Sequence, residues 1–423
     1  MSVLKNTSIT VAGKFLSSGA AALAAVVVAA ALGAKGAGTF ALIRVFPGVI
    51  AAVLGAGITI ANPYLVAGNR HSVQRVTETT VALGLVVGAL GWLGWWLVIG
   101  HVLHAHVYTE LTAGAALIVG LAIPLNLLRD YLNSIQQGLQ TFKAANLVLF
   151  MDDFVSLLLV LPLLAGMGGT TLIVVAAVAG TAASVVTAAA FLLRRGIRPW
   201  PRLHRDILRE AMGFGIKGHI GRMANMLNWR LDVMILSAFA SVEVVGYYAV
   251  ASKVAELFRP LSASLTFVLR PLIASLSIAE ARVRGVLLYR RVFAINLAAI
   301  AVMALTGGPL ITTFFGAEFA SAIPAFHILL IGLAAHGADG VLSGYNVGIG
   351  RPEFNTYTAL AGLVVTIVGD LMLIPPYSLI GAAAASSAAY TVKAVAFTAI
   401  FILTSKVTLT QLLGWKEYSP EPA

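Results

Sequence analysis

The chain has 423 residues, of which 59% are hydrophobic and only 11% are charged, and its mean hydropathy is +0.92. Because soluble domains carry roughly 25% charged residues, this composition excludes a water-soluble enzyme and indicates a surface that faces lipid. The chain contains no cysteine, which excludes disulfides and thiolate metal sites. The formal net charge of +11 makes the placement of the cations the next question.

Twelve separate stretches are predominantly apolar over about 20 residues, the length that crosses a hydrocarbon core of ~30 Å. A cleaved secretory signal is an alternative interpretation of the first stretch, but it leaves the later ones unexplained. The sequence therefore predicts an all-α integral membrane protein with about twelve transmembrane helices. The predicted spans are residues 8–33, 39–66, 79–101, 111–138, 143–166, 170–194, 211–239, 243–275, 285–306, 320–347, 354–375 and 379–404.

The cations gather in every second loop between these spans. The loop at residues 194–209 alone carries six arginines, whereas Lys35 is the one clear cation of the alternate loops. Since loops rich in Lys and Arg stay in the cytoplasm, we predict a multi-pass membrane protein with both termini cytoplasmic. Nucleic-acid binding by the Arg-rich loop is the weaker alternative, so we predict no nucleic-acid partner.

The Arg-rich segment also separates two halves that look alike. Three residues of the second span recur in the eighth at one constant offset, namely Gly38 and Gly246, Ala41 and Ala249, and Pro63 and Pro271. Because six spans separate the copies, both halves share one orientation. Such a repeat places a cavity between two lobes. Chance similarity of apolar helices is the alternative explanation. We predict an N-terminal six-helix lobe at 1–195, a cytoplasmic linker at 196–212, a C-terminal six-helix lobe at 213–405 and a cytoplasmic tail at 406–423.

Ionisable side chains lie within the predicted spans, where each costs about 2.5–3.5 kcal/mol on insertion scales. The seventh and eighth spans hold six cations against two anions, Asp232 and Glu256. On a helical projection Lys217 and Arg222 share one face with Asp232, and Arg230 lies off that face. Pairing, or snorkelling to the interface, is the alternative for any single residue. The surplus predicts an anionic ligand, and phosphate is the natural partner of arginine.

A stripe of polar residues marks two other spans. It consists of Asn126, Asp130, Asn133, Gln137 and Gln140 in the fourth span and of His336, Asp339, Ser343 and Asn346 in the tenth. Amides and carboxylates hydrogen-bond sugar hydroxyls, but the same residue types also join helices inside membranes. Sugar contacts and helix packing both remain open at this point.

The remaining polar clusters indicate no chemistry. The adjacent acids Asp152 and Asp153 are expected near the cytoplasmic start of the fifth span, at the interface. The histidines His101, His104 and His106 lack an acidic cluster that would complete a metal site. Because no nucleophile and base combine in the sequence, we predict no enzyme, no catalytic residue and no metal.

Several short motifs match a known family in order and spacing. They are residues 32–40 (LGAKGAGTF), 228–232 (NWRLD), 245–253 (VGYYAVASK), 315–319 (FGAEF), 348–351 (GIGR), and 374–375 (IP) followed by 380–383 (IGAA). Over nearly the whole chain the sequence resembles polysaccharide flippases, the O-antigen group in particular, of the multidrug/oligosaccharidyl-lipid/polysaccharide exporter superfamily. The resemblance implies a MATE-like V of two pseudo-symmetric six-helix bundles that opens alternately to either side.

The resemblance also implies the substrate, a polyprenyl-diphosphate-linked oligosaccharide moved from the cytoplasmic to the outer leaflet for surface polysaccharide biosynthesis. The residues predicted to contact the diphosphate are Arg222, Arg259, Arg270, Lys217, Lys253 and Arg44. Those predicted to contact sugars are Asp130, Asn133, Gln137, Asp339 and Asn346. The candidates for carrying a coupling H⁺ or Na⁺ are Asp232, Asp339 and Asp370, and no other cofactor is predicted.

The resemblance implies a monomer in the lipid bilayer of the bacterial plasma (inner) membrane, with a polysaccharide polymerase and glycosyltransferases as possible partners in the same assembly process. Two other functions stay as alternatives. A cation or drug antiporter of the same superfamily would favour an acidic or aromatic lumen, which the surplus of Arg and Lys opposes. A non-transporting scaffold of a polysaccharide assembly complex would not need charges inside the membrane.

Overall fold

The computed structural model describes residues 3–68, 70–98, 111–258, 276 and 278–413, and over these it contains helices and no strand. By length and composition, eight helical segments in the described part can cross a membrane. Two of them are so long that each provides two crossings. The predicted all-α membrane fold is therefore confirmed, and the helix count follows from how these two segments bend.

The first long segment, α1 (Val3–Leu54), folds back on itself at Gly33, whose φ of 63° suits a glycine. Ser17, before the bend, and Arg44, after it, both bind the carboxylate of Asp153. A straight helix would hold positions 17 and 44 about 40 Å apart. The two halves of α1 therefore run side by side and form the first two crossings.

The last long segment, α16 (Glu353–Ser405), repeats this arrangement at Ser378, which has a φ of 52° and follows Pro375 and Pro376. Prolines remove backbone hydrogen bonds and interrupt a helix. Residues on either side of the bend touch, because a Cβ on Gly369 would lie 3.0 Å from the Cβ of Ala385. The halves of α16 thus form the last two crossings.

Shorter helices complete the two halves of the chain. The first half adds α2 (Ile58–Ala67), α3 (Val73–Val98), α5 (Ala113–Gly120), α6 (Ala122–Gly138), α7 (Phe142–Val160) with the 3₁₀ turn η2 (Leu161–Ala165), and α8 (Gly169–Leu193). The second adds α9 (Arg205–Asn228), α10 (Leu231–Phe239), α11 (Val242–Ala255) with η3 (Glu256–Phe258), α13 (Ile278–Phe315), η4 (Ala317–Ala322), α14 (Ile323–His336), α15 (Asp339–Gly348) and α17 (Leu409–Leu413). Over the described residues the path matches the predicted order of crossings.

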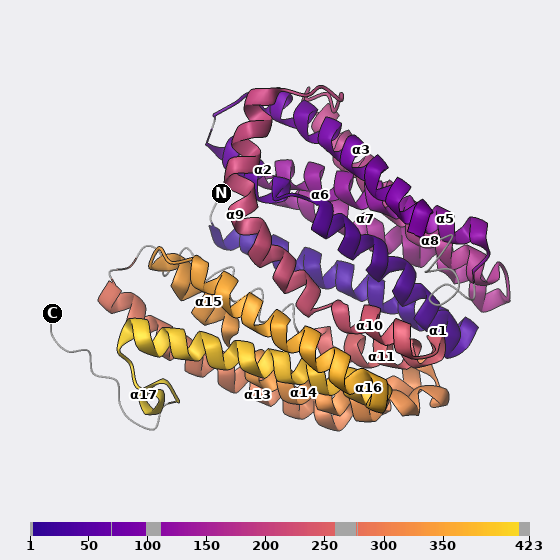
Figure 1. The fold of residues 1–423 in the computed structure, drawn as a ribbon, viewed down its shortest axis with the longest axis vertical. Coiled ribbons are helices and arrows are strands. Elements are labelled where there is room, and N and C mark those ends of the chain that lie inside the picture. The colour runs from indigo at the N-terminus through magenta and orange to yellow at the C-terminus, as the bar shows by residue number, and fades with distance from the viewer. Residues whose placement is uncertain (1–2, 69, 99–110, 259–275, 277, 414–423) are drawn as a thin grey trace.

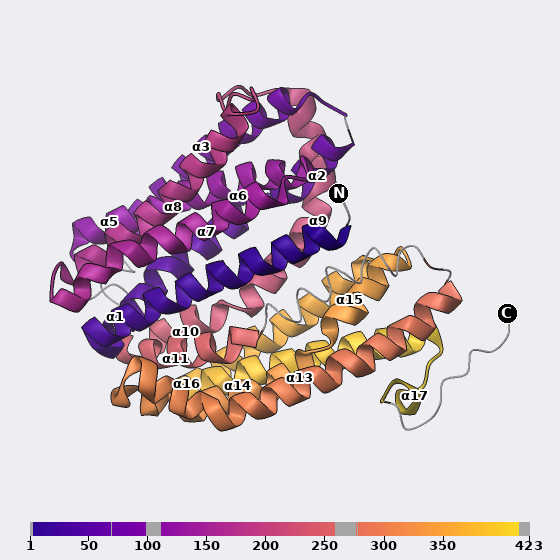
Figure 2. The ribbon, with the colours of Figure 1, turned by 180° about the vertical axis from the view of Figure 1, so that it is seen from behind.

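The helices form two lobes that meet at one end and diverge towards the other (Figures 1 and 2). We call the meeting end the kink end, because the bends at Gly33 and Ser378 lie there. We call the diverging end the terminal end, because α1 begins and α17 lies there. The molecule is a V, as the resemblance implied, with its open side at the terminal end.

Helix α9 contacts both lobes, although the predicted boundary at residue 213 assigns it to the second. Its first half packs on α2 so closely that a Cβ on Gly215 would lie 2.4 Å from the carbonyl oxygen of Gly57. Near its end, Asn228 Nδ2 donates to the carbonyl oxygen of Ala359 on α16 at 2.9 Å. The lobe boundaries stay a prediction, and α9 is the mechanical link between the lobes.

Ion pairs tie the beginning of α9 to the first lobe at the terminal end. Arg75 Nη2 lies 3.0 Å from Asp206 Oδ2, and His71 Nε2 lies 2.7 Å from Glu210 Oε2. A third pair joins His204 Nε2 to Glu78 Oε2 at 2.7 Å. Any motion of the second lobe relative to the first must therefore either break this group of contacts or bend α9 beyond it.

The kink end is closed by two glycines that pack backbone against backbone. A Cβ on Gly38 would lie 2.0 Å from the carbonyl oxygen of Val242, and a Cβ on Gly246 would lie 2.0 Å from that of Ala34. These are the glycines that the predicted repeat pairs with each other. Because no side chain fits at either position, α1 and α11 approach as closely as their backbones allow.

We predict that Gly246→Ala forces the kink end apart. Overpacking costs about 1–3 kcal/mol, which shifts the open–closed equilibrium about tenfold. Because the chain lacks cysteine, a Ser252→Cys reporter on α11, which lines the space between the lobes, can be labelled without background. A membrane-impermeant thiol reagent supplied at the kink-end side should label it about tenfold faster in the Gly246→Ala protein.

The matched control is Gly19→Ala, because an added Cβ there meets nothing within 4 Å. Equal labelling of the reporter in both alanine variants would contradict a closure that depends on the contact between the glycines.

Candidate functional site

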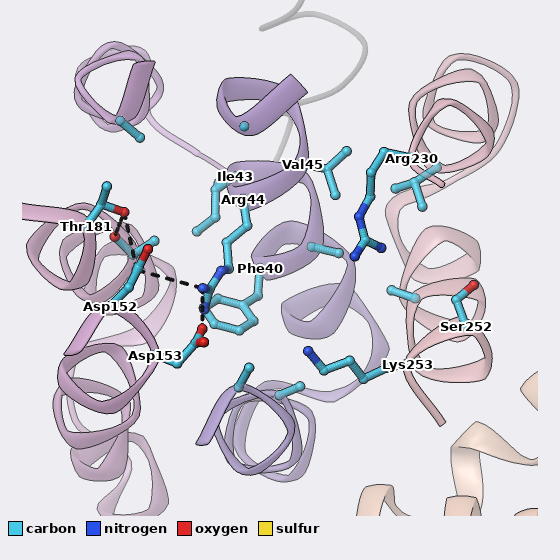
Figure 3. Close-up of a pocket in the computed structure, with 18 of the residues that line it drawn as sticks. Phe40, Ile43, Arg44, Val45, Asp152, Asp153, Thr181, Arg230, Ser252 and Lys253 are labelled. Carbon is cyan, nitrogen blue, oxygen red and sulfur yellow. Dashed lines mark hydrogen bonds and ion pairs between the residues drawn. The ribbon is translucent and has the colours of Figure 1, made fainter. Parts of the chain in front are cut away.

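A cavity of about 460 Å³ lies between the lobes, a size typical of ligand sites. One wall comes from α1, α6, α7 and α8, and the other from the end of α9, α10, α11 and the start of η3. Its charged lining residues are Arg44, Arg129, Asp152, Asp153, Arg230, Lys253 and Glu256. Figure 3 shows several of these side chains pointing into the shared space.

On the first wall, α7 holds the guanidinium of Arg44 with two adjacent carboxylates. Arg44 Nη2 lies 2.6 Å from Asp153 Oδ1 and 3.8 Å from Asp152 Oδ1. The ring of Phe40, one turn earlier on α1, lies 5.6 Å from the guanidinium carbon. Arg44 is thus fixed in place by α7 and by its own helix (Figure 3).

A second arginine completes this wall from α6. Arg129 Nη1 pairs with Asp152 Oδ2, and Arg129 Nη2 lies 2.9 Å from Asp130 Oδ1. Asp152 is only 6% exposed and also accepts a hydrogen bond from Thr181 Oγ1 at 3.4 Å. Two arginines therefore face three carboxylates, and the first wall carries its own neutralising charge.

The opposite wall is different, because its cations are only weakly paired. Arg230 Nη2 lies 3.7 Å from Glu256 Oε2, which is too long for a hydrogen bond. Lys253 forms no ion pair or hydrogen bond with any residue in the described part of the chain. Figure 3 shows Lys253 extending towards the side of Asp153, and Arg230 extending from its helix towards α1. This wall offers free positive charge to a ligand.

Arg230 enters the cavity because the helix is broken beside it. Between α9 and α10, Trp229 has a φ of −102° and Arg230 has a φ of −139° with ψ of −15°. The helical projection assumed one continuous helix over 211–239 and placed Arg230 off the polar face. In the structure Arg230 lines the cavity while Lys217 and Arg222 do not, so it does lie off their face, and the break sets its direction. The ring of Trp229 packs 4.7 Å from that of Tyr390 at this break.

Asp152 and Asp153 lie deeper along their helix than the expected position at the interface. α7 begins at Phe142, so Asp152 lies ten residues into the helix, about 15 Å from its start. That depth is roughly half of a hydrocarbon core of ~30 Å. The distance from the predicted start of the span, at residue 143, was the signal that would have placed both acids at mid-membrane.

The structure brings together two of the six residues predicted to contact diphosphate, Arg44 and Lys253. Lys217 and Arg222 are exposed on α9, before the part of that helix that lines the cavity, and Arg222 Nη1 donates to Thr59 Oγ1 at 2.9 Å. Arg259 and Arg270 lie outside the described residues. The role predicted for these four stays a prediction.

The residues predicted to contact sugars lie mostly within the lobes. Asp339 is buried and accepts a hydrogen bond from His336 Nδ1 at 2.6 Å, and Asn346 is buried and donates to Asn355 Oδ1 at 3.0 Å. Three others lie on α6: Asp130 is paired with Arg129, Asn133 is buried and Gln137 is exposed. Of the polar stripe on the fourth span, Asn126 lines the cavity.

Two candidates for ion coupling lie in the second lobe, away from the cavity lining. Asp232 accepts hydrogen bonds from Tyr248 Oη at 2.5 Å and Ser386 Oγ at 2.8 Å. Asp370 is fully buried, and neither of its carboxylate oxygens has a hydrogen-bond partner in the described part. The two acids are close enough to interact electrostatically. A buried carboxylate without a partner needs a proton or a cation.

Comparison with known proteins adds a family and a fold. A family described as "Polysaccharide biosynthesis protein" matches residues 3–277. An uncharacterized membrane protein of Methanocaldococcus jannaschii is 27% identical over 188 residues, which cover 42% of this chain and 36% of that protein. The chain therefore matches only about a third of the length of this relative.

Two solved structures align over almost the whole chain. A multidrug resistance MATE family transporter of the MOP superfamily in an inward-facing conformation gives a TM-score of 0.76, at 16% identity over 99% of this chain and 97% of that one. An outward-facing conformation of such a transporter gives 0.68, at 16% identity over 98% and 97%. The fold is that of MATE transporters, as the V-shaped arrangement indicated.

We predict that Arg129→Gln destabilises the protein strongly. It leaves the buried carboxylate of Asp152 without its main partner, and breaking a buried ion pair in this way costs about 3–5 kcal/mol. Thermal unfolding in detergent, followed by loss of the monodisperse peak, should show a clear drop in Tm. Arg222→Gln, at an exposed position, is the matched control and should change Tm little. Similar Tm values for the two variants would show that the network of the first wall does not stabilise the lobe.

Proposed function

The chain belongs to the polysaccharide biosynthesis protein family, and on that premise we propose that it is a flippase for a polyprenyl-diphosphate-linked oligosaccharide. It would move this lipid from the cytoplasmic to the outer leaflet of the bacterial inner membrane. The observation that carries the proposal is the weakly paired cation wall of Arg230 and Lys253, which faces Arg44 across a cavity between two lobes.

The physical obstacle to flipping is the charged head group, because an ion in hydrocarbon loses its hydration. The polyprenyl tail can stay in the bilayer while only the head group enters the cavity. Arg230 and Lys253 from the second lobe and Arg44 from the first can bind the diphosphate from opposite sides. Guanidinium groups suit this task, because their planar donors match phosphate oxygens.

Neutral polar side chains supply the second requirement, which is hydrogen bonding to sugar hydroxyls. Ser17, Ser18, Asn126, Thr181 and Ser252 all line the same cavity. Hydroxyl and amide groups both donate and accept hydrogen bonds. These residues therefore replace, in the proposal, most of the sugar contacts that the sequence suggested.

The closed kink end and the open terminal end define one state of an alternating-access cycle. With both termini cytoplasmic, as the loop charges predict, this is the state that loads substrate from the cytoplasmic leaflet. Rocking of the lobes would then open the contact of Gly38 with Gly246 and close the terminal end. The ion pairs of α9 with the first lobe keep its first half with that lobe. Gly215 still packs on the first lobe and Gly221 already packs on Thr356 of α16, so the hinge of this proposal is the part of α9 between these two glycines.

Coupling to an ion gradient is proposed at Asp232 and Asp370. Asp370 has no hydrogen-bond partner in the described part, while Asp232 already accepts three hydrogen bonds, from Tyr248, Ser386 and the backbone N–H of Val233. Binding of H⁺ or Na⁺ beside Asp370 would neutralise buried charge where α10 and α16 pack together. Since α10 follows the proposed hinge, occupancy there can bias the angle between the lobes.

A cation or drug antiporter is the second candidate, because the first wall holds three carboxylates against two arginines. An excess of acid would attract a cationic substrate. The two candidates place their ligands on opposite walls, so a substitution on the second wall separates them.

We predict that Lys253→Gln lowers flipping about tenfold or more, because a hydrogen bond to a charged group contributes about 1.5–3 kcal/mol. The assay uses proteoliposomes that carry a fluorescent polyprenyl-diphosphate oligosaccharide, with a leaflet-selective quencher reporting its transfer. Lys143→Gln, at an exposed position at the start of α7, is the matched control. Absence of lipid transfer by the wild-type protein, together with uptake of cationic dyes, would replace the flippase with the antiporter.

We also predict that Asp370→Asn removes the dependence of the initial flipping rate on an imposed H⁺ or Na⁺ gradient while downhill equilibration continues. An asparagine cannot exchange a proton and holds a cation weakly. Asp339→Asn is the informative comparison, because Asp339 already pairs with His336 and its substitution should leave the gradient response intact. The reverse pattern would assign coupling to His336 and Asp339.

A further inference from the structure

Asp153 occupies the place at Arg44 that a substrate phosphate would take. We propose that Asp153 is an internal counter-anion, which the diphosphate must displace from Arg44, and that this competition makes the cavity selective for polyanionic head groups. The inference rests on the proposed function, since it takes the diphosphate as the ligand. It assigns a role to a residue that the sequence placed at the interface.

The geometry separates Asp153 from its neighbour Asp152. Asp152 is turned into the lobe, where Arg129 and Thr181 bind it. The side chain of Asp153 is more exposed, at 15% against 8% for Asp152, and it lies at the cavity beside Arg44 (Figure 3). Asp153 is therefore the carboxylate of this pair that can move without unpairing Arg129.

The charges explain why Asp153 has to leave Arg44. With Asp153 in place, Arg44 is already neutralised at 2.6 Å, and an approaching phosphate would meet a carboxylate of the same sign. Once displaced, Asp153 keeps a hydrogen bond, because Ser17 Oγ donates to its other oxygen at 2.5 Å. Ser17 is thus a hydrogen-bond donor to Asp153 that does not depend on Arg44.

Selectivity follows because the competitor belongs to the same chain. A tethered carboxylate acts at a high effective concentration, so a free monoanion competes with it poorly. A diphosphate also contacts Lys253 and Arg230 on the opposite wall. These additional contacts allow it to displace Asp153 from Arg44. The three carboxylates of the cavity nearly neutralise its four cations, and Arg44 becomes available only to a ligand that contacts both walls.

The test measures binding of inorganic pyrophosphate and of monophosphate to the purified full-length protein by isothermal titration. Asp153→Asn should tighten pyrophosphate binding about tenfold and tighten monophosphate binding at least as much, so that the preference for pyrophosphate shrinks. Asp130→Asn is the matched control, because it removes the same charge but pairs with Arg129 and not with Arg44. It should change both affinities much less.

Two further variants keep the test decisive. Asp153→Ala replaces the asparagine variant if that protein does not fold, and it should show the same gain. Adding Arg44→Gln to either variant should abolish the gain in pyrophosphate affinity, because the guanidinium that the Asp153 substitution frees is then absent. Unchanged or weaker pyrophosphate binding in the Asp153 variants, or an equal gain in Asp130→Asn, would overturn the inference.

The outcomes also separate this inference from the proposed function. A tenfold gain in pyrophosphate binding by a protein that does not flip the lipid-linked oligosaccharide would reject the flippase and keep the counter-anion. Flipping by the wild-type protein without any such gain in the Asp153 variants would keep the flippase and reject the counter-anion.

Discussion

The arrangement of this protein depends on how it neutralises buried arginines. Inside hydrocarbon an unpaired charge is strongly disfavoured, so Arg44 and Arg129 are stable only where acids meet them. Those acids come from α6 and α7, and the arginines come from α1 and α6. One ion-pair network therefore joins three helices of the first lobe into a rigid body. Because this lobe satisfies its own charges, the weakly paired cations of the cavity lie on the other wall.

This asymmetry between the lobes determines where motion can occur. The first half of α9 is held to the first lobe by Gly57 and Gly215 and by ion pairs at the terminal end. Its last turn is bound to α16 of the second lobe. The break at Trp229 and Arg230 lies immediately beyond, between two segments that both pack on α16. A bend of α9 that lets the lobes move must therefore lie before Gly221, which packs on Thr356 of α16. Arg230 therefore moves with the second lobe and Arg44 with the first, so under the proposed function a ligand that contacts both would link its binding to the angle between the lobes.

The sequence predicted the membrane fold well because the physical signals that define it are local. Apolar length marks each crossing, and the recurrence of Gly38 as Gly246 anticipated two residues that pack against each other at the kink end. The site was less predictable because its determinants are not local. Arg230 depends on a helix break that a continuous projection cannot represent, and the pairing of Arg129 with Asp152 joins different helices. Depth along α7 was readable from the sequence, and it was the one signal left unused for Asp152 and Asp153.

The number of charges in the seventh and eighth spans did not predict the net charge of the cavity lining. Six cations against two anions in two spans suggested a strongly positive lumen, yet the cavity lining has four cations and three carboxylates. A nearly neutral cavity still suits a diphosphate if the cations of the cavity lack close partners and its carboxylates are paired with other residues. Lys253 is free in the described structure, whereas Asp152 is held by Arg129. Under the proposed function, diphosphate binding is therefore governed by which charges can leave their partners, and among the carboxylates facing Arg44 that is Asp153.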